Sequence, residues 1–418
     1  MPSSPVNLII LGAGNRGRVY ADYALRYPDL ARVAAVAEPR RAYREAFAEV
    51  HALSEEQLFT DWQQLAARTR FADAVVIATP DRQHAEPAAA FAAQGYSLLL
   101  EKPIAPAEAD CLQVAEAVRK AGVLCAVGHV LRYTPYTQAL KRLLAEGAVG
   151  DIVSVQHLEP VGYWHIAHSY VRGNWRSEAG SAPLLLAKSC HDLDWLSFIV
   201  GSSWARVSSF GNLKHFTKAN KPPEAAEAVR CLDCAFEPKC PYSAKKIYLR
   251  MLEQGTSGMP LTALTLDVTR AGILKALEHG SYGRCVYECD NDVVDHQVTN
   301  LLFENGVTAS FTVTGFSETR PRQTRIFGTE GELTGDGSSL TLYDFLTETK
   351  RVLWQAGAQA DTLRGHGGGD EGLMAAFVRA VAEGQTEMPG ASFAEALDAH
   401  LLGFAAERSR LSGQTVSR

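Results

Sequence analysis

A glycine-rich turn near the start of the chain has the spacing of a dinucleotide-binding loop. The segment Gly12-Ala13-Gly14-Asn15-Arg16-Gly17 follows the apolar run VNLIIL and opens a helical pattern. In this context the first glycine permits a tight turn, the second lets the backbone approach a pyrophosphate, and the third allows close packing of helix on strand. Glu38 ends the second apolar run, where a carboxylate can accept hydrogen bonds from the adenosine ribose. The sequence therefore predicts a dinucleotide site formed by Gly12, Gly14, Asn15, Arg16, Gly17 and Glu38.

Glu38 also bears on which dinucleotide binds. Its negative charge repels a 2′-phosphate, which favours NAD over NADP. Arg40 and Arg41 follow at once. They either offset that repulsion or lie at a solvated helix start, and we favour the second interpretation. We therefore expect NAD as the cofactor.

Strands alternate with helices through the first third of the chain. The apolar runs RVAAVAE, DAVVIATP and SLLLEKP are separated by helical patterns, which implies parallel βαβ units. We expect an α/β Rossmann domain over residues 1–128. From Asp151 the runs alternate apolar and polar residues, as in IVSVQHLEP, a pattern typical of antiparallel sheets. We expect an α+β second domain with a large, mostly antiparallel open sheet over residues 129–365, and helices over residues 366–418 that pack back on the body.

Composition excludes several classes of partner. The net charge is -6, so no basic field attracts nucleic acid or an anionic membrane surface. The sequence has no run of about 18 apolar residues, the length that spans a bilayer, and no secretory leader pattern. Three of the eight cysteines, Cys111, Cys125 and Cys190, lie in apolar segments. We expect a cytoplasmic protein with a small-molecule partner.

Two further motifs end the later apolar runs, and together with the glycine loop they point to one family. They are Ala78-Thr79-Pro80 with His84, and Glu101-Lys102-Pro103; a helix start, Cys190-His191-Asp192-Leu193-Asp194, follows in the second domain. The chain closely resembles, over nearly its whole length, the glucose-fructose oxidoreductase, inositol dehydrogenase and rhizopine catabolism (Gfo/Idh/MocA) family. The resemblance implies the two-domain fold above, and it implies cofactor contacts from Thr79, Pro80, His84, Glu101 and Lys102.

The resemblance also implies that Lys102 and His191 approach the nicotinamide and the reacting hydroxyl from opposite domains. Oxidation of an alcohol by hydride loss requires removal of its hydroxyl proton, so a base must lie within hydrogen-bond reach. Dehydrogenases of the family often carry an aspartate four residues before this histidine, where this chain has Ala187. Asp194 can partly replace it, and Lys188 is either a second proton carrier or a structural lysine.

Aromatic faces and polar donors suited to a carbohydrate gather in later segments. The excess of Arg, His and Lys among them favours an acidic sugar. Other polar and aromatic residues of these segments are Tyr163, Trp164, His168 and Asp370. The predicted substrate residues are Arg132, Tyr133, His165, Arg172, Trp175, Asp192 and His366.

A Pro-rich insertion over about residues 214–258 carries Cys231, Cys234 and Cys240 as C-x2-C-x5-C. Three thiolates in a short loop can bind a structural zinc ion if Cys285, Cys289 or His215 supplies a fourth ligand. A reducing compartment disfavours disulfides. Reduced thiols without metal remain the alternative.

Three functions are consistent with these residues. The first is NAD-dependent transfer of a hydride from a secondary hydroxyl of a sugar, sugar acid or cyclitol. The second is an NAD-dependent glycosidase that oxidises its sugar transiently, eliminates the aglycone and returns the hydride. The third is a non-catalytic sugar or cofactor sensor, against which the presence of Lys102 and His191 argues. We expect a homo-oligomer formed through the exposed face of the second sheet.

Overall fold

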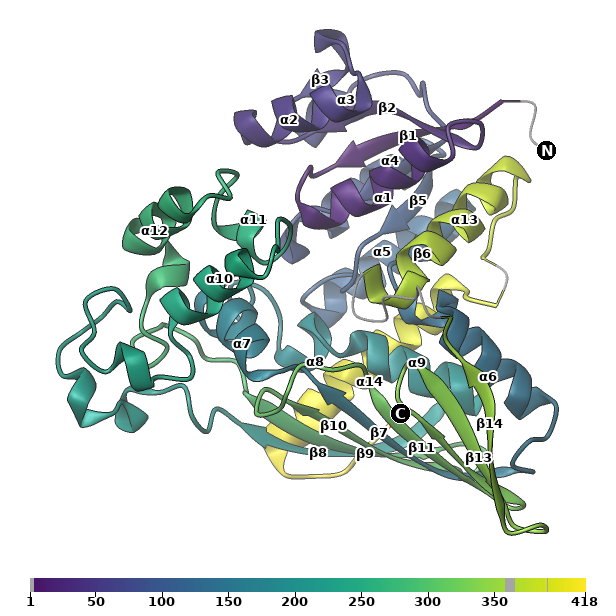
Figure 1. Cartoon of the computed structure of the whole chain (residues 1–418). Coiled ribbons are helices and arrows are strands. Elements are labelled where there is room, and N and C mark those ends of the chain that lie inside the picture. Colours follow the sequence, from purple (N-terminus) through teal and green to yellow (C-terminus); the bar gives the residue numbers. More distant parts are fainter. Residues whose placement is uncertain (1–3, 358–364, 389) are drawn as a thin grey trace.

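The structure, a computed structural model, describes residues 4–357, 365–388 and 390–418. It contains two β-sheets, each with helices packed on it (Figure 1). The smaller sheet belongs to the N-terminal part of the chain, and the larger sheet is built mostly from residues after Asp151. Among the described residues no helix is long and apolar enough to cross a membrane.

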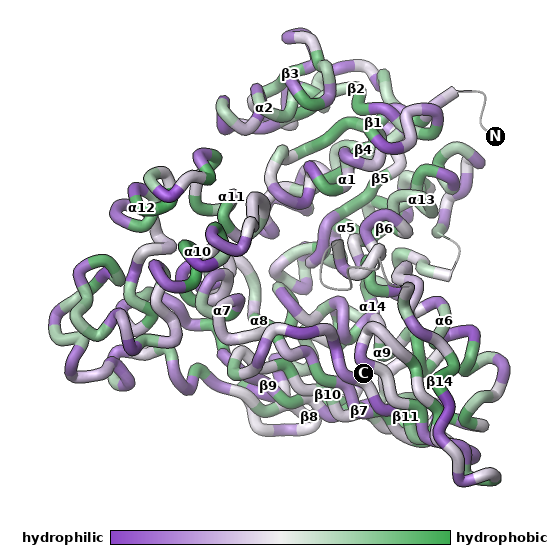
Figure 2. Tube along the Cα trace, in the orientation of Figure 1, coloured by the Kyte–Doolittle hydropathy of each residue, from purple (hydrophilic) through white to green (hydrophobic). Residues whose placement is uncertain are grey.

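The first sheet has six parallel strands in the order β3-β2-β1-β4-β5-β6, which confirms the predicted Rossmann domain. Helices cover both faces, so β1, β4 and β5 are apolar along nearly their whole length (Figure 2). The strands are β1 (Val6–Leu11), β2 (Ala31–Ala37), β3 (Leu58–Phe59), β4 (Ala74–Ile77), β5 (Ser97–Leu100) and β6 (Cys125–Val127). The helices are α1 (Asn15–Arg26), α2 (Arg41–His51), α3 (Trp62–Ala66), α4 (Ala85–Ala93) and α5 (Glu108–Ala121).

The second sheet has nine strands in the order β14-β13-β12-β11-β7-β10-β9-β8-β15. Only β7 and β10 pair in parallel, so the sheet is mostly antiparallel, as predicted. The strands are β7 (Ile152–Pro160), β8 (Trp204–Asn212), β9 (His296–Phe303), β10 (Thr308–Thr314), β11 (Gln323–Gly328), β12 (Gly331–Gly335), β13 (Ser339–Asp344), β14 (Thr349–Gln355) and β15 (Val416–Ser417).

Helices pack on one face of this sheet and form the largest core of the molecule. Leu193 and Leu196 of α9 and Leu402 of α14 meet Phe311 of β10 and Ile326 of β11 there. Figure 1 shows these helices between the two sheets. The helices of this layer are α6 (Pro135–Ala145), α8 (Leu184–Ala187), α9 (Cys190–Val200) and α14 (Phe393–Ser412).

A long excursion, residues 213–295, separates β8 from β9 and is called here the β8–β9 segment. It includes the insertion expected over about residues 214–258. Tyr248, Ile273 and Leu277 belong to its small separate core. Its helices are α10 (Ala244–Glu253), α11 (Leu261–Leu264) and α12 (Arg270–His279).

The C-terminal helices return to both domains. Leu373, Met374 and Phe377 of α13 (Gly369–Ala382) lie in the same core as Tyr20 of α1. Helix α14 contributes Ala396 to the other face of the Rossmann sheet as well as packing on the second sheet. The two domains are thus joined by helices as well as by the chain that connects them.

Candidate active site

The glycine loop between β1 and α1 has the shape that a bound pyrophosphate needs. Gly12 has φ +90°, and a Cβ there would lie 2.6 Å from the carbonyl oxygen of Ala78. A Cβ on Gly17 would lie 1.9 Å from the carbonyl oxygen of Gly12. Gly14 differs, because the nearest atom to its Cβ would be Nη2 of Arg40 at 3.8 Å. Gly12 and Gly17 are therefore required by the protein itself, while Gly14 leaves open space in front of the N-terminus of α1, where an anionic group binds favourably.

Glu38 reaches this loop from the end of β2. One of its carboxylate oxygens accepts a hydrogen bond from the backbone N–H of Ala13 at 2.9 Å, and both accept from the Arg40 guanidinium, at 2.7 and 2.9 Å. Burial raises the pKa of Glu38, but the Arg40 side chain and backbone hydrogen bonds outweigh it, so the pKa lies below its ordinary value. Glu38 is charged at neutral pH beside the open space, and Arg40, predicted to be a solvated residue, is its partner.

The two motifs that end β4 and β5 lie against each other. The His84 ring is fully buried and bridges the loops, with Nδ1 2.7 Å from the carbonyl oxygen of Pro103 and Nε2 2.9 Å from that of Thr79. His84 therefore positions both strand ends.

Glu101 connects the second of these motifs to α1. Its carboxylate accepts hydrogen bonds from Nε of Arg16 at 2.5 Å, from the Tyr20 hydroxyl at 2.8 Å and from the Lys102 backbone N–H at 2.8 Å. Nη2 of Arg16 also pairs with Asp370 at 2.5 Å. Arg16 and Glu101 thus fix the turn after β5 that carries Lys102.

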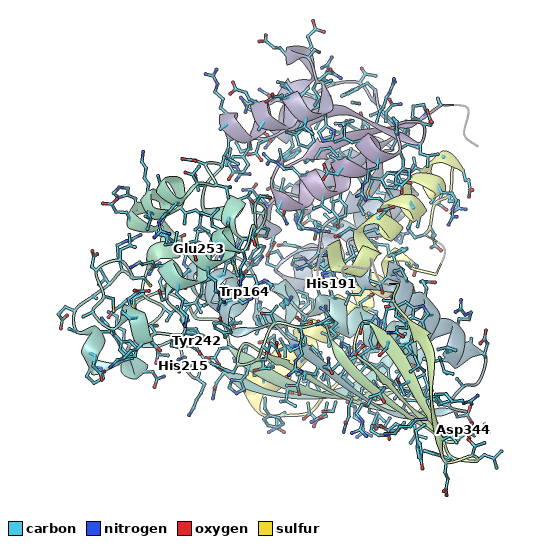
Figure 3. The ribbon with its side chains drawn as sticks, in the orientation of Figure 1. Trp164, His191, His215, Tyr242, Glu253 and Asp344 are labelled. Atoms are coloured by element: carbon cyan, nitrogen blue, oxygen red, sulfur yellow. The ribbon has the colours of Figure 1, made fainter. Side chains whose placement is uncertain are left out.

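Lys102 extends from the Rossmann domain to the second domain. Its Nζ donates a hydrogen bond of 2.6 Å to the carbonyl oxygen of Ala187, at the end of α8. His191 lies one turn further on, 4% exposed, and its buried Nδ1 has no hydrogen-bond partner among the described residues. Figure 3 shows His191 between the two sheets. The resemblance placed these two side chains at one point, and the structure has their segments in contact.

Several basic side chains share this region. Burial lowers the pKa of His191, and the charges of Lys102 and His366 lower it further. Burial is also the main reason why the pKa of His165 lies well below its ordinary value. The nearby basic side chains of Lys188, His168, Lys102 and His366 lower this pKa further. His191 and His165 are therefore neutral imidazoles at neutral pH. Lys102 and His366 thus lie within electrostatic range of both His165 and His191, and Lys188 lies within range of His165 and His366.

His366 differs from His165 and His191 in having a carboxylate partner among the described residues. Its Nδ1 lies 3.1 Å from Asp370, and its ring centroid lies 5.7 Å from that of His191. His366 also has φ +49°, a left-handed conformation that is uncommon for a residue other than glycine and that often marks functional sites. Asp370 therefore joins Arg16 of the cofactor domain to a histidine beside His191.

Lys188 belongs to a network of charges at the end of β7. It pairs with Glu159 at 3.2 Å, and Glu159 also pairs with Arg322 at 2.9 Å. Arg322 and His157 both contact Asp192, which is fully buried. Asp192, predicted to bind substrate, is thus held by protein groups. The sequence interpretation missed Glu159, although it ends a predicted strand, and Arg322, which lies in a loop with no local pattern.

Other predicted substrate residues have protein partners elsewhere. Arg132 is bound by Asp194 at 2.7 and 2.8 Å, so Asp194 is engaged with Arg132 instead of His191. Arg172 donates to the carbonyl oxygens of Arg284 and Tyr242, each at 2.7 Å. Two aromatic residues complete the set: Trp175 donates to Asp81 at 3.1 Å, and Tyr133 packs beside the core shared by α1 and α13.

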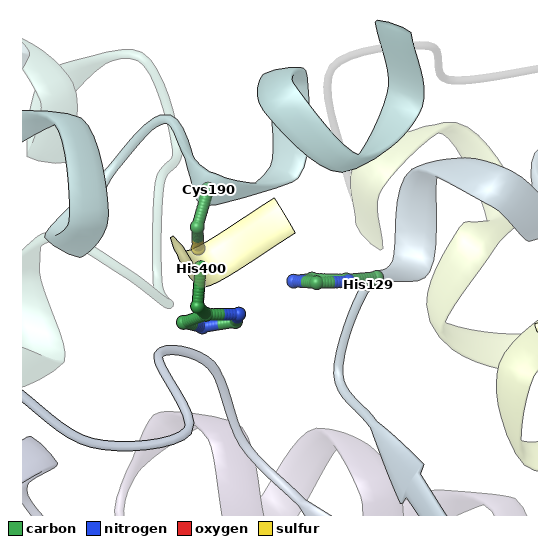
Figure 4. Close-up of side chains that lie close together, drawn as sticks. All are labelled: His129, Cys190 and His400. Atoms are coloured by element: carbon green, nitrogen blue, oxygen red, sulfur yellow. The ribbon is translucent and has the colours of Figure 1, made fainter. Parts of the chain in front are cut away.

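One buried group has atoms close enough for a metal ion. The possible ligand atoms of His129, Cys190 and His400 lie within 4.8 Å of one another (Figure 4). Both ring nitrogens of His400 are already used, because Nδ1 donates to the Ala396 carbonyl at 2.7 Å and Nε2 accepts from the Ile104 N–H at 3.0 Å. These groups fit a packed domain junction and do not fit a metal centre.

Two protein-family models cover nearly the whole chain. Residues 6–129 match the oxidoreductase family with an NAD-binding Rossmann fold, and residues 141–417 match the C-terminal alpha/beta domain of the same family. The chain belongs to the Gfo/Idh/MocA oxidoreductase family. NAD(P) is therefore the cofactor class of this Rossmann domain.

Relatives in this family have varied named activities. Inositol 2-dehydrogenase of Streptomyces avermitilis is 31% identical over 49% of this chain and 56% of its own length. The 2,7-anhydro-N-acetylneuraminate hydratase of Escherichia coli K12 is 29% identical over 35% of this chain and 39% of its own length. The matches therefore span well under two thirds of these relatives.

Solved structures show the same fold over the full length. An oxidoreductase from Agrobacterium radiobacter in complex with NAD+, L-tartaric acid and magnesium has a TM-score of 0.70 at 17% identity, covering 99% of this chain and 98% of that one. A levoglucosan dehydrogenase in complex with NADH and levoglucosan has a TM-score of 0.69 at 20% identity, with 99% of both chains covered. At this identity the likeness concerns the fold alone.

Proposed function

We propose that this Gfo/Idh/MocA protein is an NAD-dependent dehydrogenase that oxidises a secondary hydroxyl of a sugar, sugar acid or cyclitol. The observation that supports it most directly is the contact of Lys102, at the cofactor-domain strand end, with the segment that carries His191. This contact places an ammonium group and a neutral, buried imidazole beside the place where the two domains meet.

The residues of the glycine loop fit NAD, with Glu38 available to the adenosine ribose once Arg40 turns aside. Bound NAD supplies the acceptor for the hydride that leaves the substrate carbon. Lys102 donates to the reacting oxygen and stabilises the negative charge that develops there. His191, neutral and with Nδ1 unpartnered, accepts the hydroxyl proton.

The charges of the region favour an acidic sugar. Among the described residues no carboxylate lies within 4.0 Å of Lys102 Nζ, and its one hydrogen bond goes to a backbone carbonyl. A partly buried cation without a counter-ion is stabilised by an anionic ligand. One relative is named for an acidic sugar, so uronates and related anionic pyranosides are the first substrates to assay. Inositol and levoglucosan, for which two other comparisons are named, are the neutral compounds to assay beside them.

A second candidate is a redox-neutral reaction, in which oxidation is transient and the hydride returns after elimination. Two observations favour it: Ala187 stands where the family's dehydrogenases often carry an aspartate, and one relative is named a hydratase. The elimination needs additional groups that carry protons. His366, with its partner Asp370, and Lys188 are the candidates for this role.

Parallel measurement of NADH and product separates these candidates. With NAD and a panel of acidic and neutral pyranosides and inositols, we expect NADH absorbance to rise in step with ketone. Product release while NADH stays near the enzyme concentration would establish the redox-neutral reaction instead. Saturable sugar binding without turnover of any panel member would support a sensor.

We expect NAD to bind more tightly than NADP, and Glu38→Ser to reduce or reverse the difference. Removing the carboxylate ends its repulsion of a 2′-phosphate and frees Arg40 to pair with that phosphate. We therefore expect the ratio of NAD affinity to NADP affinity to fall by at least about tenfold, which corresponds to ~1.4 kcal/mol. Calorimetric titration with both cofactors measures it. Arg41→Ser is the control, because Arg41 pairs with Glu45 on the surface. Equal affinities in the unaltered protein would show that Arg40 already cancels the effect of Glu38.

A further inference from the structure

Four cysteines line one small cavity in the β8–β9 segment. Cys231, Cys234 and Cys240 come from the short loop before α10, and Cys285 comes from the chain that returns after α12. The cavity has a volume of about 20 Å³, enough for one water-sized sphere. A single ion fits this space.

Backbone pairing brings the distant Cys285 to the loop. Arg230 and Arg284 form an isolated antiparallel bridge, the Cys231 N–H donates to the Gly283 carbonyl at 2.9 Å, and the Cys285 N–H donates to the Val229 carbonyl at 2.9 Å. Cys231 and Cys285 therefore occupy fixed, neighbouring positions on two adjacent backbones.

The other two candidates for a fourth ligand have different surroundings. Cys289 does not line the cavity, and its thiol donates to the carbonyl oxygen of Cys285 at 3.3 Å. His215 is also outside the lining, and its Nε2 lies 3.2 Å from the Tyr287 hydroxyl. Glu237 does line the cavity, but its carboxylate accepts from the Ser243 hydroxyl and pairs with Lys245. Cys285 is thus the side chain that completes the set.

The sulfur of Cys231 accepts hydrogen bonds from a guanidinium and a backbone N–H, and its thiol donates to the carbonyl oxygen of Arg284 at 3.7 Å. Nη2 of Arg172 donates to this sulfur at 3.4 Å, and so does the N–H of Ala244, the first residue of α10. The Arg172 side chain is fully buried, and among the described residues no carboxylate lies within 4.0 Å of its guanidinium. A buried cation without an anion is costly. Four thiolates around a divalent ion carry a net charge of about −2, so Arg172 would have an anionic partner and would offset half of that charge.

We propose that Cys231, Cys234, Cys240 and Cys285 bind one zinc ion as four thiolates. Tetrahedral Zn–S bonds of about 2.3 Å place sulfurs about 3.8 Å apart. In the structure no three of these sulfurs lie within 4.8 Å of one another as a group, so the loop contracts around the ion. The ion would fasten the two ends of the β8–β9 segment, whose own hydrophobic core is small.

The proposal is tested by elemental analysis of protein expressed with zinc and dialysed exhaustively. We expect about one zinc per chain in the unaltered protein, loss of most of it in Cys285→Ser, and retention in Cys289→Ser, the matched control from the same turn. Cobalt substitution should give the sulfur-to-metal charge-transfer absorption of a thiolate site, lost in Cys285→Ser but not in Cys289→Ser.

Measurements on the unaltered protein keep the test valid if Cys285→Ser fails to fold. A mercurial reagent should release the zinc ion as it reacts with the four cysteine thiols that bind it. The proposal would be overturned if the unaltered protein contained no metal, or if thiol counting found disulfides. It would also be overturned if zinc were lost in Cys289→Ser and kept in Cys285→Ser. None of these readouts depends on the identity of the substrate.

Discussion

Lys102→Ala is expected to slow turnover by about 10²- to 10³-fold, the range for loss of one donor that stabilises a developing negative charge. The reason is geometric: Lys102 Nζ is the cation that the Rossmann domain places against the Ala187 carbonyl, beside His191. Affinity for NAD should change far less, because the turn after β5 that carries Lys102 is fixed by Glu101 and Arg16. Steady-state rates with the best substrate of the panel, together with cofactor titration, measure both quantities.

Lys141→Ala is the matched control for this experiment. Lys141 is also a half-buried lysine whose Nζ donates to a backbone carbonyl, that of Phe198 at 2.5 Å. It lies on α6, away from the group around His191, so its loss should leave the rate nearly unchanged. A loss below tenfold in Lys102→Ala, or an equal loss in Lys141→Ala, would remove Lys102 from the reaction.

Two alanine substitutions in the glycine loop should have opposite signatures. Gly14 has φ −72° and open space around its Cβ position, so Gly14→Ala should fold with an unchanged melting temperature. Its methyl group projects into the space for the pyrophosphate, and losing one or two hydrogen bonds to a charged group there weakens NAD binding by about 10- to 100-fold.

Gly17→Ala should instead destabilise the protein itself. Its Cβ would lie 1.9 Å from the Gly12 carbonyl oxygen, a backbone atom that cannot move without shifting β1 or α1. We expect a lower melting temperature by thermal unfolding, even with no cofactor added. Normal NAD affinity in Gly14→Ala would show that the cofactor phosphates bind elsewhere, and normal stability in Gly17→Ala would contradict the packing argument.

The parts of this protein that sequence could predict are those with a local signal. The Rossmann sheet follows from apolar runs buried on both faces, and the second sheet from strict alternation in segments such as IVSVQHLEP. Gly12 and Gly17 follow from the glycine motif at the end of the first strand. These features depend on residues close together in the chain, whose pattern carries the physical reason for the fold.

Features that depend on distant pairs had no such signal. Arg132 and Arg172 are arginines in segments rich in polar and aromatic residues, and nothing nearby in sequence shows that Asp194 binds one while backbone carbonyls and a cysteine bind the other. Arg322 is similar, because its partners Glu159 and Asp192 come from other elements. Charge pairing between elements is a property of the tertiary structure.

The place of α13 has a consequence for how the protein is made. The helix that contributes Leu373, Met374 and Phe377 to the core against α1 is encoded far downstream of the rest of that domain. A ribosome that has synthesised the six Rossmann strands has not yet made the helix that shields one of their faces. Part of the apolar surface of the nucleotide-binding half therefore stays exposed during synthesis until α13 has been made. For the same reason we expect that gene fusion can transfer this half to another protein only together with α13.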